Sequence, residues 1–222
     1  MVHKTRGIVF RFVKYGETSI IVTIFTETFG LQSYIVNGIR SKSAKNKIAL
    51  YQPLTLLNLV VYHRENANIE RIKEIQCFHP YTTIPSDIKK STIALFLAEL
   101  LNKIVKDESH AKDLFEFISQ SFITLDLLEE NFENFHLQFM LKLSRYLGFG
   151  VQNVNEVLGG RVTSEEIEKI LATVLKSDYQ TAIKMAADQR RELLDLLLKF
   201  YAEHIETLGE MNSVTILREI LH

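Results

Sequence analysis

Over the first eighty residues, hydrophobic and polar positions alternate with the period of two that β-strands show. The first run reads TRGIVFRFV, and simple alternation places Ile8, Phe10 and Phe12 on one face of its strand. Turn signals such as Phe29-Gly30 separate the runs. The pattern predicts five strands, at residues 5–13, 18–26, 31–39, 54–63 and 69–77.

Several of these predicted strands are apolar on both faces, which is typical of a closed or strongly curved sheet. Five strands within about 75 residues fit the OB-fold, a small Greek-key barrel. The first part of the chain is therefore expected to be an OB-fold barrel.

After Ser86 the hydrophobic period becomes 3.6, the period of an α-helix. Ser86-Asp87 is a candidate helix N-cap, and Thr163-Ser164-Glu165-Glu166 reads as a capping box. Residues 150–162 are expected to form a loop. Helices are predicted from residue 86, at 112–128, at 132–147, from 163, from about Tyr179, at 189–208 and at 214–221.

These patterns predict an α+β protein of two domains. The first domain, residues 1–80, is a five-stranded OB-fold barrel that binds DNA, and the second, residues 81–222, is an all-α helical domain for partner interaction. The two domains differ in charge: residues 1–80 hold 11 Lys and Arg against 5 Asp and Glu, whereas residues 81–222 hold 15 against 22. A nearly neutral chain thus contains one basic part, which is suited to phosphate.

Several classes of protein are disfavoured. The start of the chain does not read as a signal peptide, and no apolar run approaches a membrane span. Cys77 is the single cysteine, so the chain is expected to be cytoplasmic and free of a cysteine-rich zinc site. No catalytic motif, phosphate-binding glycine loop or small-molecule site is recognisable. His136 and His204 lie beside apolar stripes and are interpreted as structural.

The strongest candidate for a binding site is a basic segment between the third and fourth predicted strands. It contains Arg40, Lys42, Lys45 and Lys47, separated by small polar residues. A mobile loop of this kind gains affinity for phosphates through counterion release, although a merely solvated loop is an equally good interpretation of the segment alone. Further cations on or beside the predicted strands favour DNA binding: Arg11, Lys14, Arg71 and Lys73.

Aromatic side chains of the barrel are candidates for stacking on bases. Most are expected in the core. Tyr34 and Tyr15 are preferred over Phe25 and Phe29 as stacking residues, because a hydroxyl group tolerates water.

In the helical domain, the segment 139–149 combines an apolar stripe with Lys142 and Arg145. Such a helix can bind a partner peptide with an acidic, apolar terminus. A core helix with a solvated basic edge is the preferred interpretation for most of its length.

A family resemblance joins these features. Residues 15–30 read YGETSIIVTIFTETFG, which resembles the signature of the RecO family of bacterial recombination mediators. Weaker agreement follows in the same order along the chain, at residues 37–43, 52–54, 72–74 and 147–150.

The resemblance implies a role in homologous-recombination DNA repair without catalysis. Members of the family bind single- and double-stranded DNA, anneal strands, contact the C-terminal tail of the single-strand-binding protein SSB, and with RecR help load RecA. Arg40 and Lys42 fall on the basic loop that the family uses for DNA, and Lys45 and Lys47 extend it. The SSB contact is expected on the helical domain, near Lys142 and Arg145. Such a protein is expected to be associated with the nucleoid.

The chain departs from the family at one place. Many RecO proteins carry a four-cysteine zinc motif after the L-G-F/Y segment, but residues 151–157 contain no cysteine. We therefore expect no metal there, and expect other packing to hold residues 150–162 together. Two other functions stay open: a protein-interaction adaptor with incidental DNA affinity, and a nuclease with dispersed carboxylates.

Overall fold

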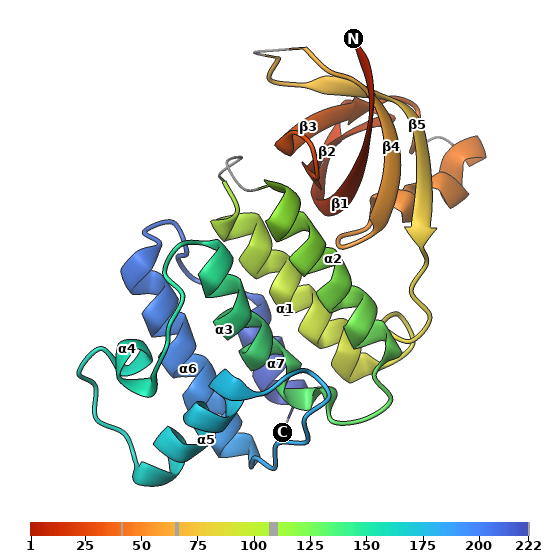
Figure 1. Ribbon diagram of the computed structural model, residues 1–222. Helices are drawn as coiled ribbons and strands as arrows, with labels where there is room; N and C mark the ends of the chain where they lie inside the picture. Colours follow the sequence, from red (N-terminus) through yellow and green to blue (C-terminus); the bar gives the residue numbers. More distant parts are fainter. Residues whose placement is uncertain (41, 65–66, 107–110, 222) are drawn as a thin grey trace. The chain divides into compact units, whose positions relative to one another are not determined.

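The N-terminal part of the chain is a closed five-stranded barrel (Figure 1). The computed structural model describes residues 1–40, 42–64, 67–106 and 111–221, with the backbone alone for residues 42–46. The barrel is formed by β1 (Val2–Tyr15), β2 (Ser19–Thr26), β3 (Gly30–Val36), β4 (Leu56–Tyr62) and β5 (Glu70–His79). The strand order is β1-β2-β3-β5-β4, and only β3 and β5 run parallel. The predicted OB-fold barrel is confirmed.

A β-bulge in β1 changes the faces that alternation predicts. The pairing with β2 shifts between Val9 and Arg11, so Phe10 is an extra residue in the strand. Val9 and Phe12 consequently contribute to the barrel interior, whereas Phe10 stacks on Phe25 at 5.6 Å between ring centroids. The prediction of Ile8, Phe10 and Phe12 on one face is therefore wrong, because one inserted residue exchanges the two faces.

The segment after β3 packs against the barrel core. Residues Lys42–Tyr51 form a 3-10 helix, η1, where the sequence suggested a mobile loop. Ile39 and Tyr51 are buried in the barrel core on either side of the basic stretch, and Ile48 packs against them. Apolar residues at both ends thus hold this segment, which corrects the expectation of a free loop.

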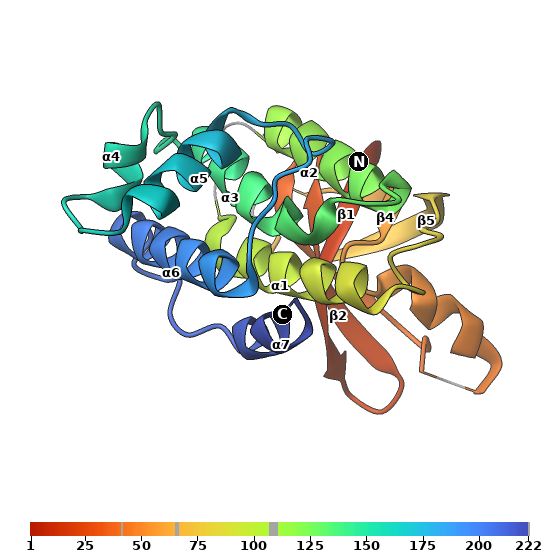
Figure 2. The same cartoon turned by 90° about the horizontal axis from the view of Figure 1, so that it is seen from below.

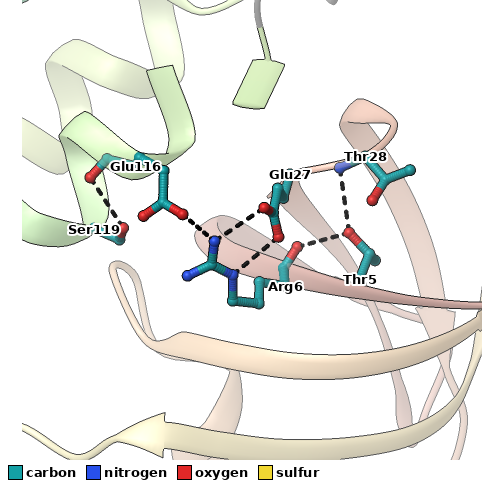
Figure 3. Close-up of polar contacts among 6 residues, drawn as sticks. All are labelled: Thr5, Arg6, Glu27, Thr28, Glu116 and Ser119. Carbon is teal, nitrogen blue, oxygen red and sulfur yellow. Dashed lines mark hydrogen bonds and ion pairs between the residues drawn. The ribbon is translucent and has the colours of Figure 1, made fainter. Parts of the chain in front are cut away.

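Part of α2 (Ala111–Leu127) packs on the outside of the barrel. The ring centroids of Phe115 and Phe25 lie 6.5 Å apart. Glu116 pairs with Arg6, whose Nε also donates to the Glu27 carboxylate at 2.9 Å (Figure 3). The hydrogen bond from Arg6 lowers the pKa of Glu27. By contacts, one compact unit therefore comprises residues 1–81 and 105–122, and the other comprises residues 82–104 and 123–222.

The remaining elements are helices (Figure 1). They include α1 (Ile88–Ile104), the short 3-10 helix η2 (Phe132–Asn134) and α3 (Phe135–Tyr146). The later elements are α4 (Val154–Leu158), α5 (Glu165–Lys176), α6 (Ala187–His204) and α7 (Ser213–Ile220). None of the helices among the described residues is long and apolar enough to cross a membrane.

Three expectations for the helical part need correction. Residues 177–186 are not helical, so no helix begins near Tyr179. The N-cap of α5 is Ser164, which accepts from the N–H of Ile167, so the predicted capping box from Thr163 is misplaced by one residue. Residues 150–162 contain α4 rather than only a loop.

Polar contacts hold this segment, which lacks cysteine. Asn153 caps α4 by accepting from the N–H of Glu156, and the Glu156 carboxylate accepts from the N–H of Gln152 at 2.7 Å. Arg161 pairs with Glu203 on α6. Caps and an ion pair therefore fasten this part of the chain.

Candidate nucleic-acid interface

The barrel presents a half-exposed outer surface on β2 and β3, which we call the β2–β3 face and define as Ile21, Thr23, Ser33 and Ile35. Their neighbours in sequence, such as Val22 and Tyr34, point into the core, so these four residues point outward. Thr23 pairs with Ser33, and Ile21 pairs with Ile35.

Two arginines border this face. Arg11 on β1 lies opposite Thr23, and Arg71 on β5 lies opposite Ile35. Both side chains are exposed, and among the described residues neither guanidinium has a carboxylate within ion-pair distance. Two residues sixty positions apart are thus brought to opposite edges of one surface.

A second group of predicted residues meets at the β1–β2 hairpin. Arg40 donates from its backbone N–H to the carbonyl of Thr18 at 2.9 Å and from Nη1 to the carbonyl of Gly16 at 3.2 Å. These bonds place Arg40 beside exposed Lys14 and Tyr15 at the end of β1. Figure 2 shows this hairpin projecting from the barrel on the side away from α2.

The other cations of the predicted site are less well placed. Lys47 on η1 is exposed, whereas the side chains of Lys42 and Lys45 lie outside the described residues. Lys73 sits where the pairing of β4 and β5 shifts register, and its Nζ lies 3.7 Å from the carboxylate of Glu74. Its charge is therefore partly compensated.

Tyr34 is not a stacking residue. Its side chain is completely buried in the barrel, so no base reaches its ring, and the prediction is wrong for this residue. Burial, with a contribution from the charge of Glu70, raises the pKa of the Tyr34 phenol. The strand period decides its position, because residues 20, 22 and 24 of the neighbouring strand face the same interior. Tyr15 remains available, with 53% of its surface exposed.

Sequence reasoning missed Tyr62 and Arg64 at the end of β4. Leu57, Leu59 and Val61 point into the barrel, so Tyr62 points outward and is 44% exposed. The alternation within residues 56–62 carries this signal, because the residue after the last inward position points to the outer face of the barrel.

The two candidate residues of the helical part differ in their availability. The ammonium of Lys142 donates to the carbonyl of Ser177 at 3.0 Å and lies 5.5 Å from the ring centre of Tyr179. Burial and the neighbouring Arg145 lower the pKa of Lys142. Arg145 itself is exposed. The ammonium of Lys142 is thus bonded within the chain, whereas the side chain of Arg145 is accessible to solvent.

Comparison with known proteins accounts for both parts of the chain. Residues 1–81 match the family model described as recombination protein O N terminal, and residues 85–169 match recombination protein O C terminal. The chain belongs to the RecO family. Proteins named DNA repair protein RecO from Bacteroides fragilis and Flavobacterium johnsoniae are both 34% identical to it, over 99% and 98% of each chain respectively. That of Phocaeicola vulgatus is 31% identical over 99% of each chain.

The RecO resemblance that residues 15–30 suggested is therefore confirmed. In structural terms, this stretch is the end of β1, the first hairpin, β2 and the turn into β3. It forms β2, which is one of the two strands of the β2–β3 face, and the hairpin whose carbonyl groups accept hydrogen bonds from Arg40. The stretch that carries the resemblance thus contributes to the candidate interface. Among the described residues, no three His, Cys, Asp or Glu side chains come together to hold a metal ion.

Proposed function

We propose that this RecO protein serves DNA repair as a recombination mediator, and that it binds DNA through the β2–β3 face. The observation that carries the proposal is that Arg11 and Arg71 border that face, while Lys14 and Arg40 meet at the adjoining β1–β2 hairpin. Strands 2 and 3 and the adjoining hairpins are also the surface that OB-folds use for oligonucleotides.

The chemistry of the face suits a nucleic-acid strand. Exposed guanidinium and ammonium groups at its borders replace the counterions of the phosphate backbone, which releases those ions and favours binding. The centre of the face is half-exposed and uncharged, so it offers space for bases rather than for phosphates. Binding of this kind requires no catalytic group, and we propose that the protein acts by binding alone.

Membership of the family supports the finer parts of the proposal. We propose that the barrel binds both single- and double-stranded DNA, and that neutralising the phosphates of two strands lets them anneal. The helical part would contact the SSB tail and RecR, so that RecA is loaded onto coated strands at the nucleoid. Of the two cations expected near the SSB tail, exposed Arg145 is the better candidate, because the ammonium of Lys142 is already bonded.

Salt dependence tests the proposal. Fluorescence anisotropy of labelled single-stranded DNA is measured against salt concentration for the parent protein and for Arg11→Ala/Lys14→Ala/Arg40→Ala. The slope of log affinity against log salt is expected to flatten by about 2, since each lost phosphate contact on a single strand contributes about 0.7.

A charge-matched control replaces three exposed lysines of the helical part: Lys176, Lys184 and Lys199. Its slope is expected to equal that of the parent. Equal slopes for all three proteins would refute the proposed interface. Weak binding that ignores salt would favour a protein-interaction adaptor, for which the apolar Ile21 and Ile35 of the face are suited. Cleavage of the probe with Mg²⁺ would favour a nuclease.

A further inference from the structure

A pocket lies at the β4–β5 hairpin, beyond the four residues of the β2–β3 face. Its volume is about 460 Å³, and it is lined by Tyr62, Arg64, Ala67, Ile69, Glu70 and Arg71. This volume is within the range of about 300–1,000 Å³ that small-molecule sites show. Tyr62 and Ile69 are 44% and 47% exposed, so the pocket has an accessible ring and an accessible apolar wall.

Among the described residues that line this pocket, the charges that reach solvent are positive. Arg64 and Arg71 are exposed, and no carboxylate within the described part of the chain lies at ion-pair distance from either guanidinium. Glu70 is turned inward: its side chain is 1% exposed, and its carboxylate accepts from the N–H of Arg64 at 2.9 Å. It also lies 2.8 Å from Nδ1 of His63. The carboxylate is thus hydrogen-bonded within the hairpin, and the charged groups that an incoming anion meets at the solvent side are the two guanidinium groups.

The pocket is continuous with the β2–β3 face. Tyr62 lies opposite Arg71 in the β4–β5 ladder, and Arg71 lies opposite Ile35 in the β5–β3 ladder. Five paired residues on successive strands mark a path along the curved barrel wall: Tyr62, Arg71, Ile35, Ile21 and Val13. The path crosses four strand spacings, which is about 19 Å at 4.8 Å each. A strand several nucleotides long spans this surface, in keeping with the roughly 4–16 nucleotides that one OB-fold covers.

We propose that this pocket receives an unpaired base of a single DNA strand, which stacks on the ring of Tyr62 while Arg64 and Arg71 bind the flanking phosphates. A guanidinium forms two parallel hydrogen bonds to a phosphate, so two arginines beside one ring suit a nucleotide with its backbone. A base in a duplex is already stacked and paired, and it offers no free face to the tyrosine. The pocket therefore distinguishes single strands from double strands. This inference rests on the proposed function.

A tryptophan reporter tests the stacking directly, because the chain contains no tryptophan. Tyr62→Trp is titrated with an oligothymidine of about 20 nucleotides, which exceeds the site size of one OB-fold. We expect the indole fluorescence to be quenched. An abasic oligonucleotide of equal length and charge is expected to bind through its phosphates without quenching. Tyr146→Trp is the matched control, since Tyr146 is 40% exposed and lies on a helix; its fluorescence is expected to be unchanged.

Affinity measurements complete the test. Tyr62→Ala is expected to bind oligothymidine about 5- to 150-fold more weakly, whereas Tyr62→Phe stays within about twofold, since stacking needs the ring and not the hydroxyl. Neither variant is expected to change affinity for the abasic oligonucleotide or for a duplex. An unchanged unfolding midpoint in urea shows that both variants fold.

The failure of this inference differs from the failure of the proposed function. If Arg11→Ala/Lys14→Ala/Arg40→Ala weakens DNA binding while Tyr62→Ala leaves oligothymidine affinity unchanged, the pocket proposal is overturned and the interface stands. Equal losses on oligothymidine, abasic strand and duplex overturn it as well, because the tyrosine then acts through packing or charge. Normal DNA affinity of Tyr62→Ala with loss of a protein partner assigns the pocket to that partner and also overturns the proposal.

Discussion

Removing the carboxylate of Asp126 should destabilise the helical unit more than any surface change. Asp126 lies near the end of α2, is 2% exposed, and accepts hydrogen bonds from the backbone N–H groups of Thr82, Thr83 and Ile84 at 2.8–3.1 Å. It thereby holds the segment that follows the barrel. The buried ammonium of Lys90 bonds the same turn, through the hydroxyl of Thr83 at 2.7 Å and the carbonyl of Asp126 at 3.2 Å.

The magnitude follows from these bonds. Asp126→Ala leaves three N–H groups without their charged acceptor, and hydrogen bonds to charged groups contribute about 1.5–3 kcal/mol each, with incomplete additivity. We expect a loss of about 3–5 kcal/mol. In Asp126→Asn one oxygen still accepts from Thr83 and Ile84, which share Oδ1, while the amide NH₂ faces the donors of Thr82. That variant should lose about 1–2 kcal/mol.

The stability that is lost when Asp126 is replaced should also depend on pH. Burial raises the pKa of Asp126, but the hydrogen bonds from Ile84, Thr82 and Thr83 outweigh it and lower the pKa. Because the folded-state pKa is below the unfolded-state value of about 3.9, the carboxylate contributes fully above that value. Its contribution is lost as the pH falls through the folded-state pKa. The stability difference between parent and Asp126→Asn should therefore shrink on acidification.

Urea unfolding followed by far-UV circular dichroism, repeated from neutral pH to about pH 3, measures these quantities. Asp113→Asn, an exposed Asp on the same helix, is the control and should stay within about 0.5 kcal/mol of the parent. A cost below about 1 kcal/mol for Asp126→Ala, or a difference that is constant down to pH 3, would refute the reasoning.

Three further predictions concern single residues. Gly7→Ala should destabilise the barrel by about 1–3 kcal/mol in thermal unfolding, because the added Cβ would lie 2.6 Å from Cγ2 of Ile24 in the interior; parent-like stability would contradict this. Tyr34→Phe should unfold at the same or a higher urea concentration and bind DNA normally, since its buried hydroxyl has no hydrogen-bond partner among the described residues; weakened DNA binding would restore Tyr34 as a contact. Asn153→Ala should lower the free energy of unfolding by about 1 kcal/mol, because the cap of α4 is lost, whereas the carboxylate introduced by Asn153→Asp can still accept the capping hydrogen bond and should keep most of that stability. Equal losses of stability for the two variants in calorimetry would exclude capping as the cause.

Hydrophobic periodicity predicted the two kinds of structure and the place where one changes to the other. Periodicity was less successful for a polar segment whose ends carry buried apolar residues. The residues around η1 show this, because Ile39 and Tyr51 reach the barrel core from either side of a stretch that looks like a solvated loop. The misplaced cap of α5 is an error of one residue, which local patterns do not resolve.

For the candidate site, the sequence identified most of the cations but not the surface that they share. Arg11, Lys14, Arg40 and Arg71 were recognised from the charge of the first eighty residues, yet Tyr34 was misassigned and Tyr62 was missed. Charge is visible in a sequence because every Lys and Arg carries it wherever it lies. The exposure of a tyrosine is not, because it depends on which strand face becomes the interior.

By itself the sequence determined the five strands, the helical remainder, the basic character of the first part and the RecO signature at residues 15–30, because periodicity, charge and motif spacing are properties of neighbouring residues. Tertiary structure decided that the bulge at Phe10 exchanges the faces of β1 and that the parallel pairing of β3 with β5 closes the barrel. That closure brings Arg71 beside Ile35 and makes Tyr62 part of a pocket. Such pairings join residues tens of positions apart, and their register is selected by burial of one face of every strand at once, which no local pattern contains.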